Sequence, residues 1–384
     1  NIDRKNNTVS LVNSFNENHL SEDFCIFSSG NIFVNDDEFR KAGIQIKRKE
    51  RPNNKGEDEY YFIRLDQDGN ELTEVAGIPD RIASASETTI SFAIKLDEEG
   101  HVMPIGKDEL SLYAYLPMNE HRFKFPFYLN ADFIPKSDRE GIQSDNPWNY
   151  FLFYSIGKEI VSMVANYASE LNTNYLNLLP TKELSYSSQD TAALVDSFNR
   201  GYKDALTSIP FILNDISEIV GPDNIIFDAS GLSATIGAFS FYRLIDTTKH
   251  LPHESIDSSS LSKDIFGIEK ITTEAIISIL KNNLDILKKW VIDTSDELRT
   301  SFYKWLAKEE KGQSLVPLVP TFMFEEEWKT TSEINVEDKL LISTEKISTI
   351  KPILSKLGFK CSDHSIEDHP LALFIDSQDA KAIF

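Results

Sequence analysis

The sequence predicts an α+β fold, in which a mixed or antiparallel sheet comes first and a mostly helical region with short strands follows. Up to about residue 135, short apolar runs alternate with turn signals. The clearest is a hairpin in which residues 60–65 and 71–75 flank the turn at 66–70. After residue 145 the apolar residues recur at three- and four-residue spacing, which indicates helices. Strands followed by helices, rather than alternating with them, are typical of the α+β class.

The other expected strands of the N-terminal part are equally short. Residues 88–96 alternate apolar and polar side chains, and the turn at 97–100 leads them into a partner run. These further runs lie at residues 8–15, 24–27, 101–105, 110–116 and 125–133.

A long helix is expected from Asn146, which can act as N-cap with Pro147 at the first helical position, to about residue 171. A loop rich in Ser, Thr and Tyr follows at 173–189. We therefore expect one domain over residues 1–170 and a second over residues 171–384. The second can divide further near 248–265.

The second region reads as helices with short strands between them. Expected helices span 191–206 and 233–245, and expected strands span 210–213 and 224–227. Thr272 or Thr273, Ser295 and Thr344 can each cap one of three later helices; the first should reach Trp290, and Gly358 suits the end of the last. Residues 315–324 read as an extended edge segment because Pro317 and Pro320 interrupt them.

Composition limits the classes of function. A hydrophobic content of 41% predicts a globular chain, and 39 basic against 61 acidic residues give a net charge of −22. This charge makes nucleic acid an unlikely partner, because phosphate binding needs a cationic surface. The basic run from Arg40 to Arg51 is interpreted as a solvated strand and loop. Only Cys25 and Cys361 occur and no long apolar run exists, so a cytoplasmic protein without a membrane span is expected.

The most informative segment spans residues 125–149. Its apolar strand ends in the polar loop 134–143, Ile-Pro-Lys-Ser-Asp-Arg-Glu-Gly-Ile-Gln, and then enters the helix capped by Asn146. Backbone N–H groups and the dipole of a helix N-terminus favour an anion at such a place. Lys136 and Arg139 add positive charge, and Gln143 adds a neutral donor.

This segment resembles the catalytic loop in the middle domain of ninety-kilodalton heat-shock chaperones, and it is similar to sacsin-like, chaperone-related GHKL ATPases. The quoted features are Asn130–Phe133, Ser137-Asp138-Arg139 and Trp148-Asn149. One departure is Asp138, because the chaperone pattern has Ser directly before the Arg. The resemblance is specific over about 25 residues and weaker over roughly 85–170.

The resemblance implies a transducer or middle-like domain that senses a nucleotide bound by a preceding ATPase domain. Arg139 matches the Arg that contacts the terminal phosphate, and Gln143 matches the polar residue that assists it; both are the expected catalytic residues. Lys136, Ser137, Arg139 and Gln143 are the expected cofactor-binding residues. ATP and Mg²⁺ would be held by the upstream domain, and no metal site is expected here.

The nucleotide pocket of the GHKL family is not recognisable in this chain. Neither Asp-x-Gly-x-Gly nor a Walker-type loop occurs, and residues 228–231 lack the Gly spacing. The chain begins with polar residues and no Met, so we expect it to be a segment of a longer protein. No ATP hydrolysis is expected of it alone. Its expected partners are its own upstream ATPase domain and a protein client or a second copy.

Several alternatives stay open. The chain is a non-catalytic protein-interaction scaffold in a second interpretation, and a stand-alone hydrolase in a third. Arg139 forms a structural ion pair with Asp138, Glu140 or Asp145 if it does not reach a phosphate. Arg122 or Lys124 lines the same anion site in a further variant.

Two groups of side chains in the C-terminal part are interpreted as structural and not as ligand-binding. A polar loop is expected for Cys361, Asp363, His364, Asp368 and His369, whose spacing matches no closed zinc site. Core or interface positions are expected for Trp290, Trp305 and Trp328.

Overall fold

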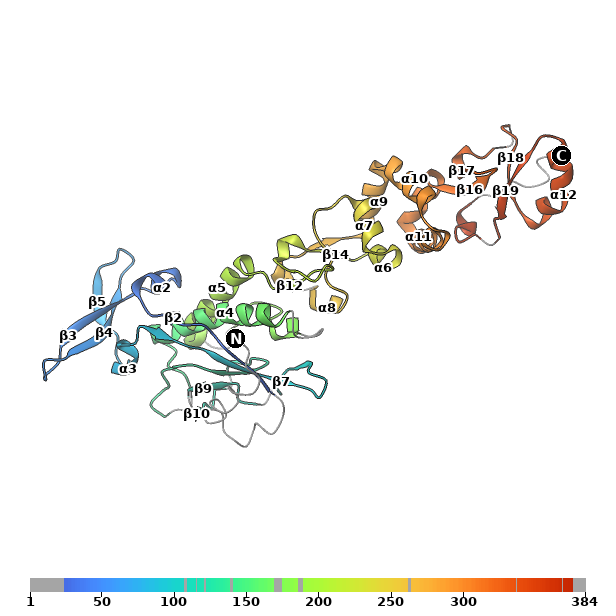
Figure 1. Cartoon of the computed structure of the whole chain (residues 1–384). Helices are drawn as coiled ribbons and strands as arrows, with labels where there is room; N and C mark the ends of the chain where they lie inside the picture. Colours follow the sequence, from blue (N-terminus) through green and yellow to red (C-terminus); the bar gives the residue numbers. More distant parts are fainter. Residues whose placement is uncertain are drawn as a thin grey trace. The chain divides into compact units, whose positions relative to one another are not determined.

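The chain has an α+β fold that divides into two compact units (Figure 1). The computed structural model describes residues 24–106, 109–114, 116–120, 122–138, 141–168, 175–185, 189–261, 264–335, 337–367 and 369–375. The first unit extends to Ile225 and also includes Pro252–Ile268, and the second consists of Ile226–Leu251 and Glu269–Phe384. The expected strand at residues 8–15 lies outside the described residues.

The first unit contains most of the strands. They are β1 (Phe24–Ser28), β2 (Ile32–Phe33), β3 (Ile46–Pro52), β4 (Asp58–Leu65), β5 (Glu71–Glu74), β6 (Glu87–Thr88), β7 (Ser91–Leu96), β8 (Val102–Met103), β9 (Leu112–Ala114), β10 (Leu116–Pro117), β11 (Tyr128–Asn130), β12 (Ile212–Leu213) and β13 (Ile219–Val220). Its helices are α2 (Asp36–Lys41), α3 (Asp80–Ala83), α4 (Pro147–Tyr167), α5 (Ala192–Ser208) and α8 (Ser258–Leu261), with short 3₁₀ turns at Tyr175–Leu178, Gln189–Thr191, Pro222–Asn224 and Asp264–Phe266.

The main sheet of this unit is mixed, as the sequence predicts. Its strand order is β1-β7-β11-β9-β10, with β8 paired to β7, and β11 runs parallel to β9 while its pairing with β7 is antiparallel. A separate antiparallel sheet, β3-β4-β5, contains the predicted hairpin, and its β3 includes most of the basic run. Of the strand expected at 125–133, only Tyr128–Asn130 is a strand in the structure.

The helices α4 and α5 pack against each other at backbone contact. A Cβ added at Gly157 would lie 2.3 Å from the Phe198 carbonyl oxygen, and one at Gly201 would lie 2.0 Å from that of Tyr154. Because α5 is fixed to α4 in this way, it belongs to the first unit. The compact division at residues 225/226 therefore differs from the expected boundary near 170, and the expected division near 248–265 falls where the chain returns to the first unit.

The second unit is mostly helical with three two-stranded sheets. Its elements are β14 (Ile226–Asp228), α6 (Leu232–Ile236), α7 (Ala238–Ile245), β15 (Glu269–Ile271), α9 (Thr273–Asn282), α10 (Leu284–Asp293), α11 (Asp296–Lys308), β16 (Pro320–Phe324), β17 (Glu327–Thr330), β18 (Leu340–Ser343), α12 (Glu345–Lys356) and β19 (Lys360–Ser365), with 3₁₀ turns at Glu310–Leu318, Thr331–Glu333 and Ala372–Phe374. The pairs β14-β15 and β18-β19 are parallel, whereas β16-β17 is antiparallel.

Three expectations for this unit are wrong in detail. The expected helix at 233–245 is interrupted at Gly237, whose φ of 80° is left-handed. The helix expected to reach Trp290 is divided at Asn283 into α9 and α10. Residues up to Leu318 form a 3₁₀ turn, and only Pro320–Phe324 is a strand.

Candidate functional site

The predicted loop 134–143 is closed by a short antiparallel ladder. Pro135 and Ile142 form a β-bridge. On either side of it, the N–H of Lys136 donates to the Gly141 carbonyl at 2.8 Å, and the N–H of Gln143 donates to the Ile134 carbonyl at 3.0 Å. The two ends of the loop therefore meet at a fixed base.

Asn149 of α4 holds both ends of this base. Its Oδ1 accepts the N–H of Ile134 at 2.9 Å, and its Nδ2 donates to the carbonyls of Ile134 and Gln143, each at 2.9 Å. The side chain is fully buried, so these bonds replace hydration that it has lost. The neighbouring residue Trp148 holds the segment just before the loop, because its indole N–H donates to the Asp132 carbonyl at 2.8 Å.

A buried ion pair supports the returning strand of the loop. Arg122 donates to both carboxylate oxygens of Glu120, at 2.8 and 2.5 Å, and the N–H of Ile142 donates to Glu120 at 3.3 Å. Burial alone would raise the pKa of Glu120, but these hydrogen bonds outweigh it and lower the pKa. A Cβ added at Gly141 would lie 3.0 Å from this carboxylate, so a larger residue would press on the ion pair.

A cavity of about 350 Å³ opens beside the loop. Three of the four expected binding residues line it, namely Lys136, Ser137 and Gln143. Other segments contribute the remaining lining residues, which are Arg64, Ala76, Gly77, Asp145 and Asn146. The structure thus brings together most of the residues that the sequence predicts as a site.

The polar groups of this cavity are held in place. Gln143 Oε1 accepts from the Asn146 amide at 3.3 Å, while the Asn146 Oδ1 accepts the N–H of Trp148 and caps α4. Arg64 of β4 donates to the Asp145 carbonyl at 3.0 Å. The first turn of α4 contains no acidic residue, so the positive end of its dipole is not offset there.

This arrangement suits an anion. Arg64 and Lys136 supply two positive charges against the single carboxylate of Asp145 among the lining residues that the structure describes. Gln143 adds a neutral amide at the junction with the helix N-terminus. Lys136 and Ser137 are exposed, so a bound anion would lie at the surface.

Arg139 itself, with Glu140, lies outside the described residues. Its expected role and the alternative of an ion pair with Asp138, Glu140 or Asp145 both stay predictions. The sequence did not indicate Arg64, Glu120 or the anchoring function of Asn149, because each reaches the loop only through tertiary contacts.

Arg122 and Lys124 are not among the residues that line the cavity beside the loop, and their sharing of the anion site stays a prediction. Both line a different cavity, of about 630 Å³, together with residues of the segment 177–185. Arg122 is also occupied by Glu120 and by Asp190, whose carboxylate accepts from it at 2.9 Å.

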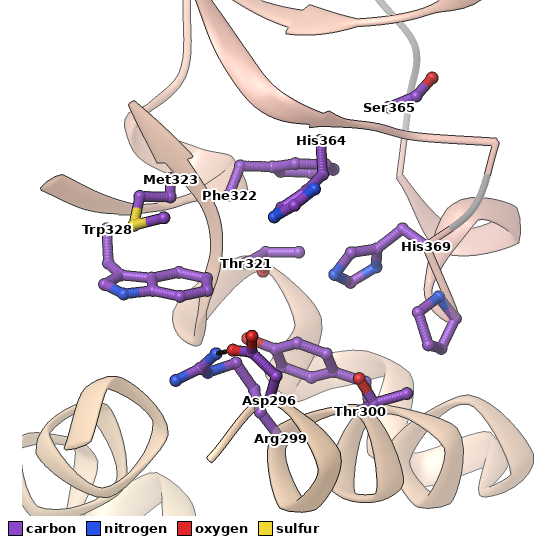
Figure 2. A pocket seen from close by; sticks show the side chains of 12 residues that line it. Asp296, Arg299, Thr300, Thr321, Phe322, Met323, Trp328, His364, Ser365 and His369 are labelled. Carbon is purple, nitrogen blue, oxygen red and sulfur yellow. Dashed lines mark hydrogen bonds and ion pairs between the residues drawn. The ribbon is translucent and has the colours of Figure 1, made fainter. Parts of the chain in front are cut away.

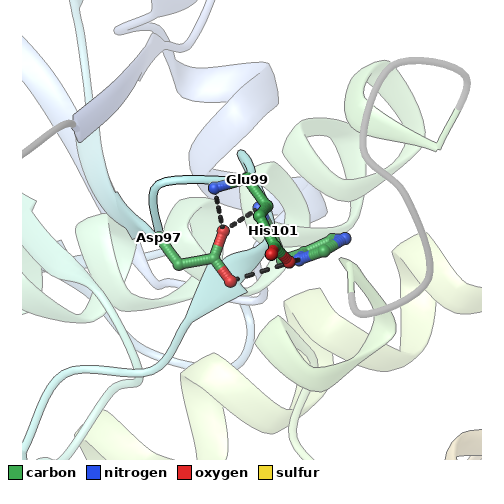
Figure 3. Close-up of side chains that lie close together, drawn as sticks. All are labelled: Asp97, Glu99 and His101. Carbon is green, nitrogen blue, oxygen red and sulfur yellow. Dashed lines mark hydrogen bonds and ion pairs between the residues drawn. The ribbon is translucent and has the colours of Figure 1, made fainter.

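Asp97, Glu99 and His101 converge in the turn between β7 and β8, where their ligand atoms lie within 4.8 Å of one another (Figure 3). Asp97 accepts the N–H groups of Glu99 and His101 at 3.0 and 2.7 Å and contacts the His101 Nδ1 at 3.1 Å. The backbone bond from His101 is the main cause of the lowered pKa of Asp97. These bonds stabilise the turn and explain why the three side chains lie close together.

The polar loop expected for the C-terminal residues is wrong for three of them, because Cys361, Asp363 and His364 lie on the strand β19. Cys361 is buried with a free thiol whose pKa is raised by burial. His364 is exposed, whereas His369 packs on the rings of Tyr303 and Phe322, and Asp368 lies outside the described residues. Trp290 and Trp305 are core residues, as predicted.

In comparisons with protein-family models, curated proteins and solved structures, nothing matches this chain significantly. None of the helices in the described part combines the length and apolarity that crossing a bilayer requires. A functional assignment therefore rests on the residues themselves.

Proposed function

We propose that this chain is the nucleotide-sensing and signal-transducing segment of a chaperone-like GHKL ATPase. In this proposal Arg139, which belongs to the segment 134–143, contacts the γ-phosphate of ATP that an upstream domain binds with Mg²⁺. The chain has no ATPase site of its own and acts in the cytoplasm.

One observation carries the proposal. The loop has a base fixed by Asn149 and Glu120, and its polar residues Lys136, Ser137 and Gln143 share a cationic cavity with Arg64. A fixed base limits the entropy that the segment loses on docking. Arg64, Lys136 and Ser137 are donors of the kind that bind phosphate oxygens, and Asn146, which also lines the cavity, caps α4.

The chemistry proposed for Arg139 is electrostatic. A guanidinium supplied from a second domain stabilises the charge that develops on the transferring phosphoryl group, as an arginine finger does. The loss of the terminal phosphate on hydrolysis removes this contact. The fixed loop base then transmits the change to α4, which makes hydrolysis visible to the rest of the chain.

The test uses the full-length protein that includes the upstream domain. Arg139→Ala is expected to reduce ATP turnover by a factor on the order of 10³, by analogy with arginine fingers, while the affinity for a non-hydrolysable ATP analogue changes little. Arg139→Lys should restore only part of the rate, because an ammonium lacks the planar fork. Turnover is measured by phosphate release and affinity by calorimetry.

Arg40→Ala is the matched control. It removes the same charge from an exposed side chain of α2 that pairs with Asp37, far from the loop in sequence. Unchanged turnover in Arg139→Ala would contradict the proposal and favour a protein-interaction scaffold. Equal losses of turnover and of nucleotide binding would contradict a role confined to the reacting phosphate.

A further inference from the structure

A further cavity, of about 340 Å³, lies within the C-terminal unit between α11, the β16-β17 hairpin, and the end of β19 with the segment that follows it (Figure 2). Its size is at the low end of the range of about 300–1,000 Å³ that is usual for small-molecule sites. It is independent of the loop 134–143, and the function proposed above makes no use of it.

Aromatic rings dominate the walls of this cavity. Trp328, Phe322 and Tyr303 line it together with the imidazoles of His364 and His369. Figure 2 shows Trp328, His364, His369 and Arg299 around a common space. Such walls bind flat π-systems better than saturated rings, because offset and edge-to-face contacts add to the burial of apolar area.

Several wall residues are fixed before any ligand arrives. The hydroxyl of Tyr303 donates to the Pro320 carbonyl, and the Nδ1 of His369 accepts the N–H of Leu371 at 3.2 Å. The ring of His369 lies 4.9 Å from that of Tyr303 and 5.1 Å from that of Phe322, centroid to centroid. A preformed wall loses little entropy on binding.

Arg299 gives the cavity its charge. Its side chain is buried, with donors directed to the carbonyls of Val291 at 2.7 Å and Thr294 at 2.7 Å, and its guanidinium lies 4.3 Å from the centre of the Trp328 ring. With the Ile292 carbonyl and the Asp296 carboxylate, these partners take up four of the five N–H groups and fix the orientation of the guanidinium.

An exposed carboxylate pairs with this charge. Asp296 contacts Arg299, but its side chain is 93% exposed, so the pair is weakly stabilised. Asp296 is the only acidic residue among the lining residues that the structure describes. Because its carboxylate lies in water, a ligand anion can take its place on a guanidinium that backbone carbonyls hold.

We infer that this cavity is a binding site for a small planar aromatic anion, whose rings stack on Trp328 and whose negative group lies toward Arg299. Thr300 and His364 add polar atoms at the lining. The ligand class follows from the walls and the charge: the rings select planarity, and the guanidinium selects the anion.

The experiment measures binding to the whole chain by equilibrium dialysis with three matched probes. Naphthalene-2-carboxylate has both features, naphthalene-2-carboxamide lacks the charge, and decahydronaphthalene-2-carboxylate lacks the planarity. The first is expected to bind at a single saturable site and more tightly than each of the others by on the order of tenfold.

Two variants locate the site. Trp328→Leu removes the stacking surface and is expected to weaken naphthalene-2-carboxylate binding by on the order of tenfold. Since Trp328 also contacts Arg299, a second variant, Thr300→Phe, leaves that contact in place and fills the cavity from α11, which should abolish binding. Thermal unfolding establishes that each variant is folded.

Phe239→Ala is the matched control, because it removes a ring that is 81% exposed in the same unit and does not line the cavity. Its affinity for the probe should equal that of the original chain. The inference is overturned if no saturable binding occurs, if the three probes bind equally, or if a folded Thr300→Phe chain or the control shows that binding lies elsewhere.

Discussion

Single side chains with several backbone partners fix the base of the loop 134–143 and the wall of the cavity at α11. Asn149 uses its amide to fix the start and the end of the loop 134–143, and Arg299 uses its guanidinium to satisfy carbonyls at the end of α10. Leaving such buried backbone groups without partners costs about 1–3 kcal/mol each. Both residues are therefore positioning residues, which act through the backbone they hold.

His369 makes the stability of the C-terminal unit depend on pH. Burial is the main cause that lowers its pKa, to about 4, and repulsion from His364 adds to it. The folded state thus favours the neutral ring, so its contribution to stability is complete above pH ~6.5, the usual pKa of an unfolded His. It is lost as the pH falls from there toward 4, by up to about 3 kcal/mol.

We expect the NMR titration of the His369 ring protons to give a midpoint near pH 4. The free energy of unfolding of this unit should fall over the same window. In His369→Asn, whose side-chain oxygen can still accept the N–H of Leu371, the slope between pH 6.5 and 4 should decrease. A midpoint at an ordinary His value would contradict the burial argument.

At the scale of elements, the contact between α4 and α5 places the loop base relative to the rest of the first unit. Gly157 and Gly201 face each other's helices at distances that exclude a side chain. The helix that carries Asn149 is therefore held at its middle by α5 and at its start by the loop. A shift of α4 would move the loop base with it.

We expect Gly157→Ala to destabilise the first unit by about 1–3 kcal/mol or more, because the added methyl group overlaps the Phe198 carbonyl and the helices must separate. In an ordinary helix the same change would stabilise, since Ala has the better helix propensity. Gly221→Ala is the control, with a φ of −74° and open space around its Cβ position. Chemical denaturation of each variant measures the difference, and a stabilised Gly157→Ala would contradict the close packing.

Local signals in the sequence were sufficient for many elements. Caps are local features, and the predicted Asn146, Ser295 and Thr344 all accept N–H groups at the starts of their helices. Breaks in helices were predicted less well. The division at Asn283 and the left-handed Gly237 depend on packing against the core, which periodicity does not reveal.

The sequence likewise predicts only part of the candidate site. Lys136, Ser137 and Gln143 are close in sequence, so a loop pattern can group them, and the structure places all three at one cavity. Arg64 is distant in sequence and lies on a strand that carries no motif, so its position at the same cavity emerges only from the fold. The compact division at residues 225/226 depends on tertiary contacts in the same way, because α5 packs on α4.

At the scale of the whole molecule, the chain crosses between the two units three times. It enters the second unit at residue 226, returns to the first for Pro252–Ile268, and enters the second again at Glu269. The second unit consequently combines two separate segments of sequence. The strand β14 of the early segment pairs in parallel with β15 of the late one, and the Trp305 indole N–H donates to the Ser230 carbonyl at 3.0 Å. Neither segment is a complete folding unit.

We expect a fragment of residues 226–384 to unfold cooperatively and a fragment of residues 269–384 to be largely unfolded. The shorter fragment lacks a set of buried core residues: Ile226, Leu232, Ile236, Phe241, Leu244, Ile245 and Leu251. At about 1.5–3 kcal/mol for each of these buried side chains, the loss of about 10–21 kcal/mol is comparable to or larger than the typical stability of about 5–15 kcal/mol of a domain. Circular dichroism melts and amide proton dispersion measure the outcome.

Replacing residues 252–268 in the longer fragment with a Gly/Ser linker should change its melting temperature little, because that segment packs in the other unit and loop-closure entropy depends only weakly on length. Equal melting temperatures for the two fragments would show that the late segment folds alone, contrary to the shared core.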